Sequence, residues 1–237
     1  MKTMTILALA GAAGMANAGQ IFQESFEGDP GMSYTFSNQF DDAGFDFFGR
    51  YMVPDNSNPA RDVFQSGWDG SFGIMGQDHD GDGEAATQSV MIDNIDIFGF
   101  TSLSMSMFAG ALDSEAAGFF NFEAVDGDGM SIWASIDGGA DFMIGRFSPP
   151  SSGAGDLYVD ADMDGIGDGA RPTTDLADFA FNIAGVGSSL DLRIDMTSTS
   201  SFEALAIDNI RVNGIPSPAT LGLLGMAGLA GSRRRRA

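Results

Sequence analysis

The chain lacks cysteine altogether and has a single histidine and a single lysine among its 237 residues. Without cysteine it can form no disulfide bond, so a folded domain depends on its hydrophobic core and on any bound metal. A Cys–His nucleophile pair is excluded, and a transition-metal site would lack a second soft ligand beside His79. A Ser–His–Asp triad would have to use His79, and no nucleophile-elbow motif accompanies it. We expect His79 to be a surface residue in a loop.

Basic residues are also scarce. The chain has 11 Lys and Arg against 33 Asp and Glu, a formal net charge of -22. All 33 acidic residues lie between residues 19 and 214 with only six arginines, so this segment carries -27. Such a charge excludes nucleic acids and anionic membranes as partners of the body, and it favours cation binding. It also implies self-repulsion that counter-ions or bound metal must offset.

The first 18 residues have the pattern of a secretory signal peptide. Lys2 supplies the positive start, residues 4–14 form a short apolar run, and Ala16-Asn17-Ala18 has small residues where a signal peptidase reads. We predict cleavage after Ala18 and a secreted protein. The alternative is a buried N-terminal helix, although the Gly and Ala content would make such a helix weak.

Residues 215–237 combine a Pro-Ser-Pro motif (216–218), an apolar run (219–231) and four arginines (233–236). The run is shorter than the roughly 20 residues of a spanning helix, which suits a short C-terminal hydrophobic helix with transient membrane contact. The order of motif, apolar run and arginine cluster resembles the PEP-CTERM sorting signal of bacterial envelope proteins. Ser217 stands where that signal has Glu. The resemblance implies an exosortase-type transpeptidase as partner and delivery to the cell envelope. A basic patch for nucleic acid is the alternative.

Several stretches of the body alternate apolar and polar residues with a period of two, as half-buried β-strands do. Turn signals such as VDGDGM (125–130) and IDGGAD (136–141) separate them, and helical periodicity is scarce. Residues 53–62 and 148–177 are expected to be loops. We therefore predict one all-β domain over residues 19–214, a two-sheet antiparallel β-sandwich of the jelly-roll type. The expected inward positions are Leu103, Met105 and Met107; Met130, Ile132, Ala134 and Ile136; Phe179, Phe181 and Ile183; and Leu190, Leu192, Ile194 and Met196.

The last predicted strand places a carboxylate among apolar residues. In SFEALAIDNIRVNG (201–214), Asp208 has the parity of the apolar positions, and a buried carboxylate must be paired, hydrogen-bonded or metal-bound. Hydrogen bonds to nearby backbone at a strand edge and a metal ion remain equal alternatives. The apolar positions of that parity are Phe202, Ala204, Ala206, Ile210 and Val212.

The two ends of the body, SFEG (25–28) and EALAIDNIRV (203–212), together with SIDGG (135–139), resemble the signature of concanavalin-like and MAM-like extracellular jelly rolls. The resemblance implies that the first strand, near Phe22 to Phe26, lies beside the last. It also implies a structural cation near the closing Asp208-Asn209 pair. The opening segment IFQESFEGD (21–29) offers Glu24 and Glu27 as companions of Asp208.

Alternating aspartates form two candidate calcium loops. DADMDGIGD (160–168) places Asp160, Asp162, Asp164 and Asp168 at loop positions 1, 3, 5 and 9, and Gly165 permits a sharp turn. Hard carboxylate oxygens converging in this way suit Ca²⁺. Arg171 occupies position 12, where an EF-hand has Glu, so the loop resembles those of dockerin and thrombospondin type-3 repeats. A solvated acidic loop is the alternative.

QDHDGDGEA (77–85) repeats the first half of this pattern with Asp78, Asp80 and Asp82, and then departs from it. A second Ca²⁺ site and a solvated loop are equal alternatives here. The VDGDG segment, with Asp126 and Asp128, is most simply a hairpin turn.

These features predict a secreted, envelope-sorted, calcium-binding β-sandwich. We expect it to act without catalysis, as a surface or matrix component or a binder of extracellular polysaccharide. The alternative is a carbohydrate-active enzyme, a glycoside hydrolase or lyase, on the same sandwich, because a catalytic carboxylate pair is defined by a separation that sequence does not give. Trp68 and Trp133 are candidates for stacking on sugar rings, and Trp133 has outward parity, although packing in the second sheet is the simpler role for both.

Overall fold

The computed structural model describes residues 18–42, 44–81, 83–113, 122–150 and 153–217, which form strands, turns and loops and contain no helix. The signal peptide and the C-terminal hydrophobic helix predicted above fall almost entirely on residues 1–17 and 218–237, outside this part of the chain. No span of the described residues is a helix that is long and apolar enough to cross a bilayer.

The strands form two main sheets and a small third one, and every ladder between them is antiparallel. The seven-stranded sheet has the order β13-β7-β15-β5-β4-β3, with β1 also beside β15, and the six-stranded sheet has the order β12-β10-β9-β14-β6-β2. The chain is thus an all-β sandwich, as the alternation predicts. The seven-stranded sheet comprises β1 (Gly19–Glu24), β3 (Phe40–Asp41), β4 (Phe47–Met52), β5 (Phe72–Gln77), β7 (Phe100–Ala111), β13 (Ala177–Ile183) and β15 (Leu205–Pro216). The six-stranded sheet comprises β2 (Thr35–Phe36), β6 (Thr87–Asp96), β9 (Gly129–Ile136), β10 (Phe142–Ser148), β12 (Tyr158–Val159) and β14 (Ser189–Thr197), and the third sheet pairs β8 (Phe122–Glu123) with β11 (Ala154–Gly155).

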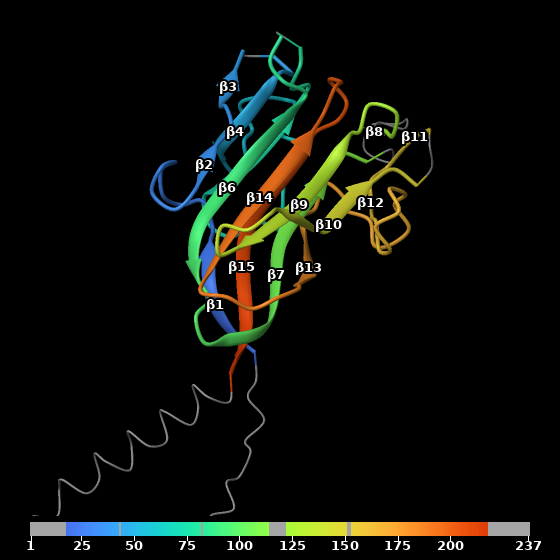
Figure 1. Cartoon of the computed structure of the whole chain (residues 1–237). Coiled ribbons are helices and arrows are strands. Elements are labelled where there is room, and N and C mark those ends of the chain that lie inside the picture. The colour runs from blue at the N-terminus through green and yellow to red at the C-terminus, as the bar shows by residue number, and fades with distance from the viewer. Residues whose placement is uncertain (1–17, 43, 82, 114–121, 151–152, 218–237) are drawn as a thin grey trace, which may run out of the picture.

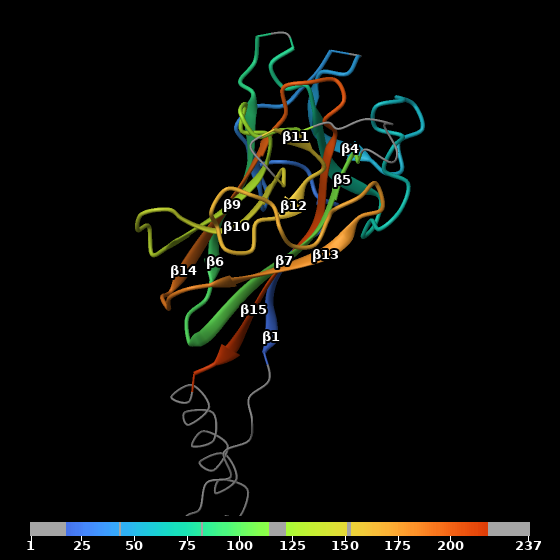
Figure 2. The same ribbon diagram turned by 90° about the vertical axis from the view of Figure 1, so that its right-hand side faces the viewer.

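The main core lies between the two large sheets, which Figure 2 shows with β6, β9 and β14 on one side and β4, β5 and β13 on the other. The strands with the clearest alternation, β7, β9, β13 and β14, turn their predicted apolar positions into this core. The β9–β10 hairpin closes at Asp137 and Gly138, whose φ angles of 51° and 67° are those of a type I′ turn. The Asp-Gly signal in the sequence therefore locates this turn correctly.

The first and last strands lie side by side, which confirms the prediction made from the two ends of the body. β1 pairs antiparallel with β15 from Gly19 opposite Gly214 to Glu24 opposite Ile210. Figure 1 shows both strands at the lower end of the sandwich. Nearer its own start, from Leu205 to Ile207, β15 pairs with β5 on the same edge. β5 and β1 therefore occupy successive parts of that edge of β15.

The single parity predicted for the last strand is wrong up to Asp208 and holds only beyond it, at Ile210 and Val212. The register shifts between Asp208 and Arg211, and Asn209 takes a left-handed φ of 46°, so the strand contains a β-bulge. Ala204, Ala206 and Asp208 face away from the main core, whereas Ile210 and Val212 join it. Phe202, expected inward, precedes the strand and is 48% exposed. A second apolar cluster covers the outer face of β15, and its buried members are Phe47, Val53, Ala60, Phe64, Met75, Leu112, Leu176, Ala204 and Ala206.

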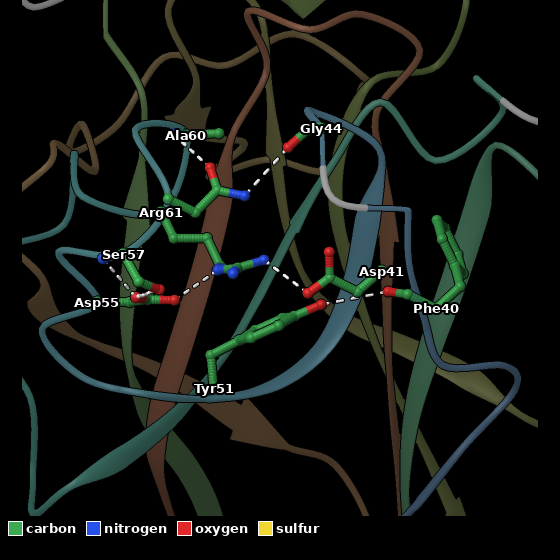
Figure 3. A network of polar contacts seen from close by, with 9 residues as sticks. Phe40, Asp41, Gly44, Tyr51, Asp55, Ser57, Ala60 and Arg61 are labelled. Atoms are coloured by element: carbon green, nitrogen blue, oxygen red, sulfur yellow. Dashed lines mark hydrogen bonds and ion pairs between the residues drawn. The ribbon is translucent and has the colours of Figure 1, made fainter.

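The predicted loop at residues 53–62 is held in place by Arg61, whose side chain is 9% exposed (Figure 3). Its Nε donates to Asp55 Oδ2 at 2.6 Å and its Nη1 donates to Asp41 Oδ2 at 2.9 Å. The guanidinium lies 4.2 Å from the ring centroid of Tyr51, whose hydroxyl donates to the carbonyl of Phe40. One arginine thus ties the loop to β3 and β4.

The second predicted loop, residues 148–177, is less irregular than expected because it contains β11 and β12. Two-residue strands are too short to show any periodicity in the sequence. The rest of the segment returns to β12, since the backbone N–H groups of Asp168 and Gly169 both donate to the carbonyl of Val159.

Candidate functional site

A row of five side chains crosses the outer face of the six-stranded sheet. The registers place Thr35 of β2, Met91 of β6, Arg193 of β14, Trp133 of β9 and Met143 of β10 opposite one another in turn. Neighbours along β6, β9 and β14, such as Ile92, Ile132 and Ile194, point into the core, so the row faces outward. With strands about 4.8 Å apart, five strands span about 19 Å.

Two adjoining hollows follow this row from Thr35 to Trp133, and Met143 lines neither of them. One, of about 330 Å³, lies around Trp133 and Arg193, and the other, of about 230 Å³, lies over Tyr34 and Thr35. Both are lined by Met91 and Asp93, so together they form one groove that runs across the strands. We call it the cross-strand groove.

Trp133 and Arg193 form the floor of the groove. The Arg193 guanidinium carbon lies 5.2 Å from the Trp133 ring centroid, a cation–π contact. Arg193 is held by Asp195, whose Oδ1 accepts from Nε at 3.0 Å, and by an ion pair with Asp141. The groove therefore contains a fixed aromatic ring and fixed donors.

Three carboxylates line the groove. Asp141 is paired with Arg193, and Asp191 accepts from the backbone N–H of Asn94 at 2.8 Å. Asp93 is exposed where the two hollows meet. With Arg193 as the only basic residue among the lining side chains, the described groove is acidic and rich in hydrogen-bond acceptors.

The two tryptophans have different roles. Trp133 faces outward into the groove, as its parity predicts. Trp68 packs against the second apolar cluster, and its Nε1 donates to the carbonyl of Phe64 at 3.1 Å. Trp68 is thus a packing residue, and Trp133 is a half-buried aromatic on the outer face of the six-stranded sheet.

The first predicted calcium loop brings three of its four aspartates together. Carboxylate oxygens of Asp160, Asp162 and Asp164 lie within 4.8 Å of one another. Asp160 is buried, and its two oxygens accept from the backbone N–H groups of Asp164 and Gly165. Asp168 is not part of the group, and its Oδ1 accepts from the N–H of Ala161. The loop is preorganised by its own backbone, with oxygens of the type that Ca²⁺ takes as ligands.

Glu27 and Asp208, predicted as ligands of one cation, both accept hydrogen bonds from backbone N–H groups of residues 69–72. Asp208 Oδ2 accepts from the N–H of Asp69 at 2.6 Å, and Oδ1 accepts from Asn209. Glu27 Oε1 accepts from the N–H groups of Ser71 and Phe72 at 2.7 and 2.9 Å. Burial first, and the charges of Asp69 and Glu27 in addition, raise the pKa of Asp208 to about 7. Backbone hydrogen bonds thus reach both oxygens of Asp208, at a bulge and not at a strand edge, and a metal ion at this carboxylate stays a prediction.

The second candidate calcium loop is not gathered in the same way. Asp78 and Asp80 do not form a group of three ligands with any described residue, and Asp82 lies outside the described part. The side chain of Asp78 instead approaches Asp46. Burial first, and this contact in addition, raise the pKa of Asp46 to about 7.

His79, expected at the surface, is fully buried. Its Nδ1 lies 3.0 Å from the carbonyl of Ala86, and its ring packs edge-on against Phe48. Burial lowers the pKa of His79 to about 4, so the ring is neutral at physiological pH. The unusual burial arises because Gly76 leaves room: a Cβ there would lie 2.3 Å from His79 Nε2.

The predicted hairpin turn with Asp126 and Asp128 is also more than a turn. Asp128 is buried and adjoins Glu203, a fully buried carboxyl that sequence reasoning missed. A lone Glu after a run of Ser and Thr shows no spacing that would single it out.

No protein-family model matches the chain, and no curated protein resembles it in sequence. Solved structures share its sandwich in outline. A cyclase from Fischerella sp. in its apo form is 12% identical, with a TM-score of 0.46 over 84% of this chain and 98% of that chain. The K3 cleaved adhesin domain of Lys-gingipain from Porphyromonas gingivalis is 11% identical, with a TM-score of 0.43 over 82% and 99%. The CBM22-1 xylan-binding domain from Paenibacillus barcinonensis is 9% identical, with a TM-score of 0.42 over 86% and 99%. At such scores these likenesses carry no argument about function, which rests on the site itself.

Proposed function

We propose that the protein is a non-catalytic, polysaccharide-binding β-sandwich and that the cross-strand groove is its binding site. The observation that carries the proposal is the continuity of the groove over four strands, β2, β6, β14 and β9, with Trp133 and Arg193 on its floor. An aromatic ring offers an apolar face to a sugar ring, while carboxylates and a guanidinium offer hydrogen bonds to its hydroxyls. Four strands about 4.8 Å apart span about 14 Å, and a site of this length suits an extended chain of sugars better than a single one.

The charge of the groove selects the class of polysaccharide. Asp93, Asp141 and Asp191 outnumber Arg193, and the body as a whole carries -27. A polyanionic chain such as a polyuronate would be repelled before it reached the groove. The proposed ligand is therefore a neutral polysaccharide.

Two of the three carboxylates in the groove already have hydrogen-bond or ion-pair partners, and this favours binding over catalysis. A glycoside hydrolase needs one carboxyl as acid and another as base or nucleophile. Asp141 is committed to an ion pair with Arg193, and Asp191 accepts from the backbone of Asn94. Cleavage of carbohydrate by a glycoside hydrolase or a lyase remains the competing function class. The product assay described below distinguishes binding from cleavage.

Calcium and an extracellular location belong to the same proposal. The convergence of Asp160, Asp162 and Asp164 supports a Ca²⁺ ion in that loop. The signal-peptide pattern at 1–18 and the sorting-signal pattern at 215–237 support secretion, exosortase-type processing and a place at the cell envelope. Intact-mass analysis of protein from the native host tests this part, since a mass that still includes Arg236 contradicts it.

Affinity electrophoresis of the full chain through gels containing neutral glucans, xylans or mannans, or polyuronates, tests the binding site. We expect retardation by at least one neutral polysaccharide, none by polyuronates, and no release of reducing or unsaturated ends. Trp133→Ala should weaken the affinity that causes this retardation by at least about tenfold, in line with the cost of removing an aromatic anchor. Phe98→Ala is the matched control, because Phe98 is an aromatic that is 75% exposed and lies outside the groove. Equal retardation of Trp133→Ala and the unmodified chain contradicts the assignment.

A further inference from the structure

We propose a second divalent-cation site, of the Ca²⁺ type, formed by Glu123, Asp126 and Asp128 of the β8–β9 turn and by Glu203 of the β14–β15 connection. We call this group the four-carboxyl cluster. It shares no residue with the Asp160 loop or with the cross-strand groove, so it does not depend on the function proposed above.

Geometry brings the first three carboxylates together. One oxygen from each of Glu123, Asp126 and Asp128 lies within 4.8 Å of the others. The turn is fixed by its backbone, because the N–H of Asp128 donates to the Glu123 carbonyl at 3.2 Å. Asp128 Oδ2 accepts in return from the N–H of Glu123 at 2.9 Å. Oxygens so placed can contact a common ion at the 2.3–2.6 Å distances of Ca²⁺.

Glu203 supplies the second, independent observation. The residue is 0% exposed, and its Oε2 accepts from the backbone N–H of Thr199 at 2.7 Å. Its Oε1 is also buried and has no hydrogen-bond partner among the described residues. The groups that approach the Glu203 carboxyl are the carboxyls of Glu123 and Asp128, which are themselves acceptors. A buried oxygen among acceptors needs either a proton shared with a neighbouring carboxyl or a cation, and the titration below distinguishes the two.

No such cation is supplied by arginine. None of the ion pairs in the described part of the chain involves Glu123, Asp126, Asp128 or Glu203. The cluster therefore gathers carboxyls that no basic side chain of the described residues pairs with, and a divalent cation would supply the positive charge.

The position of the cluster indicates what such an ion would do. Asp128 immediately precedes β9 of the six-stranded sheet, and Glu203 precedes β15 of the seven-stranded sheet. Thr199, in the same connection, also donates its hydroxyl to Asp128 Oδ1 at 3.2 Å. An ion held by both segments would fasten the crossover between the sheets to the turn that begins β9.

Calorimetric titration of the metal-stripped full chain with CaCl₂ tests the site. The parent protein for this experiment carries Asp162→Asn and Asp164→Asn, so the other candidate loop does not contribute. We expect the parent to bind one Ca²⁺ and the added change Asp126→Asn to raise its dissociation constant by about tenfold or more. Asp126 is exposed, so this variant keeps the fold. Asp96→Asn removes the same charge from another exposed turn and should leave the titration unchanged.

Glu203→Gln provides the second variant. The amide oxygen of Gln can still accept from Thr199, so the fold is kept while the buried charge is lost. We expect this variant to show no calcium heat and to melt at the same temperature with and without CaCl₂. A parent that binds no Ca²⁺, or Asp126→Asn and Glu203→Gln proteins that bind it as the parent does, would overturn the proposal. Either result leaves the Asp160 loop to be judged separately in the unmodified chain.

Discussion

His79 shows how a single residue departs from its usual environment. His79 joins three segments, because its ring Nδ1 lies beside the Ala86 carbonyl and its backbone N–H donates to the Ser198 carbonyl at 2.9 Å. It therefore holds the start of one acidic loop to the end of β14. A sequence rule that places a lone loop histidine at the surface fails here because the space comes from Gly76, three residues earlier.

The buried histidine predicts an acid-dependent loss of stability. The pKa of His79 is about 4 in the folded chain and about 6.5 when exposed. As pH falls from about 6.5 to 4, the unfolded state takes up a proton that the folded state refuses. The free energy of unfolding should therefore fall by about 3 kcal/mol over this window from His79 alone. Urea titrations at several pH values measure it.

His79→Gln serves as the comparison for this pH effect. The variant has no titrating group at this position, so its stability relative to that of the unmodified chain should rise progressively as pH falls. Carboxyls with raised pKa values, such as Asp208, act in the opposite direction, but they act in both proteins and cancel in the difference. A difference that stays constant between pH 7 and 4 would show that His79 is accessible to protons.

At the scale of elements, the sequence pattern predicts long strands that have one buried face. The prediction fails for strands that are buried on both faces or are very short. β7, β9, β13 and β14 alternate because each has one face in the core and one outside. β15 is covered on both faces and contains a bulge at Asn209, so its parity changes without any sign in the pattern. The two-residue strands β2, β3, β8, β11 and β12 have no period to detect.

The same reasoning explains what could be predicted of the sites. The outward face of Trp133 follows from parity within one strand, and the meeting of three aspartates in 160–164 follows from local spacing. The groove and the four-carboxyl cluster depend on register between strands far apart in the chain. Arg193 meets Trp133, and Asp128 meets Glu203, only through that register.

The loop at 53–62 provides a prediction about one element. Arg61 is buried between Asp41 and Asp55, so replacing it with Leu leaves two carboxylates without their partner. Loss of one member of a buried ion pair costs about 3–5 kcal/mol; because Asp41 is 38% exposed, we expect about 3 kcal/mol. Arg193→Leu is the control, since Arg193 is 35% exposed and its pairs with Asp141 and Asp195 lie at the surface. Its loss should cost less than about 1 kcal/mol in urea unfolding, and equal effects of the two changes would refute the anchoring role of Arg61.

The whole molecule carries far more negative charge than its arginines compensate. Five of the six arginines of the body form ion pairs with carboxylates in the described residues, yet the segment 19–214 retains -27. Sodium ions screen this repulsion over a Debye length of about 10 Å at 0.1 M, without organising any one loop. A cation bound at a fixed site in the folded state does both. Stability should therefore depend on the kind of cation as well as on ionic strength.

We predict that millimolar CaCl₂ raises the melting temperature more than NaCl at the same ionic strength. Binding to the folded state alone adds about 2.7 kcal/mol to the free energy of unfolding when calcium is 100 times its dissociation constant. Asp162→Asn with Asp164→Asn should remove the share of this gain that belongs to the 160–168 loop, because two of its three converging carboxylates are lost. Adding Glu203→Gln should abolish the remainder, so that the triple variant responds equally to the two salts. Scanning calorimetry of the three proteins provides the comparison. If the unmodified chain already responds equally to CaCl₂ and NaCl, its aspartate-rich loops are solvated turns and its surface charge is balanced only by the ion atmosphere.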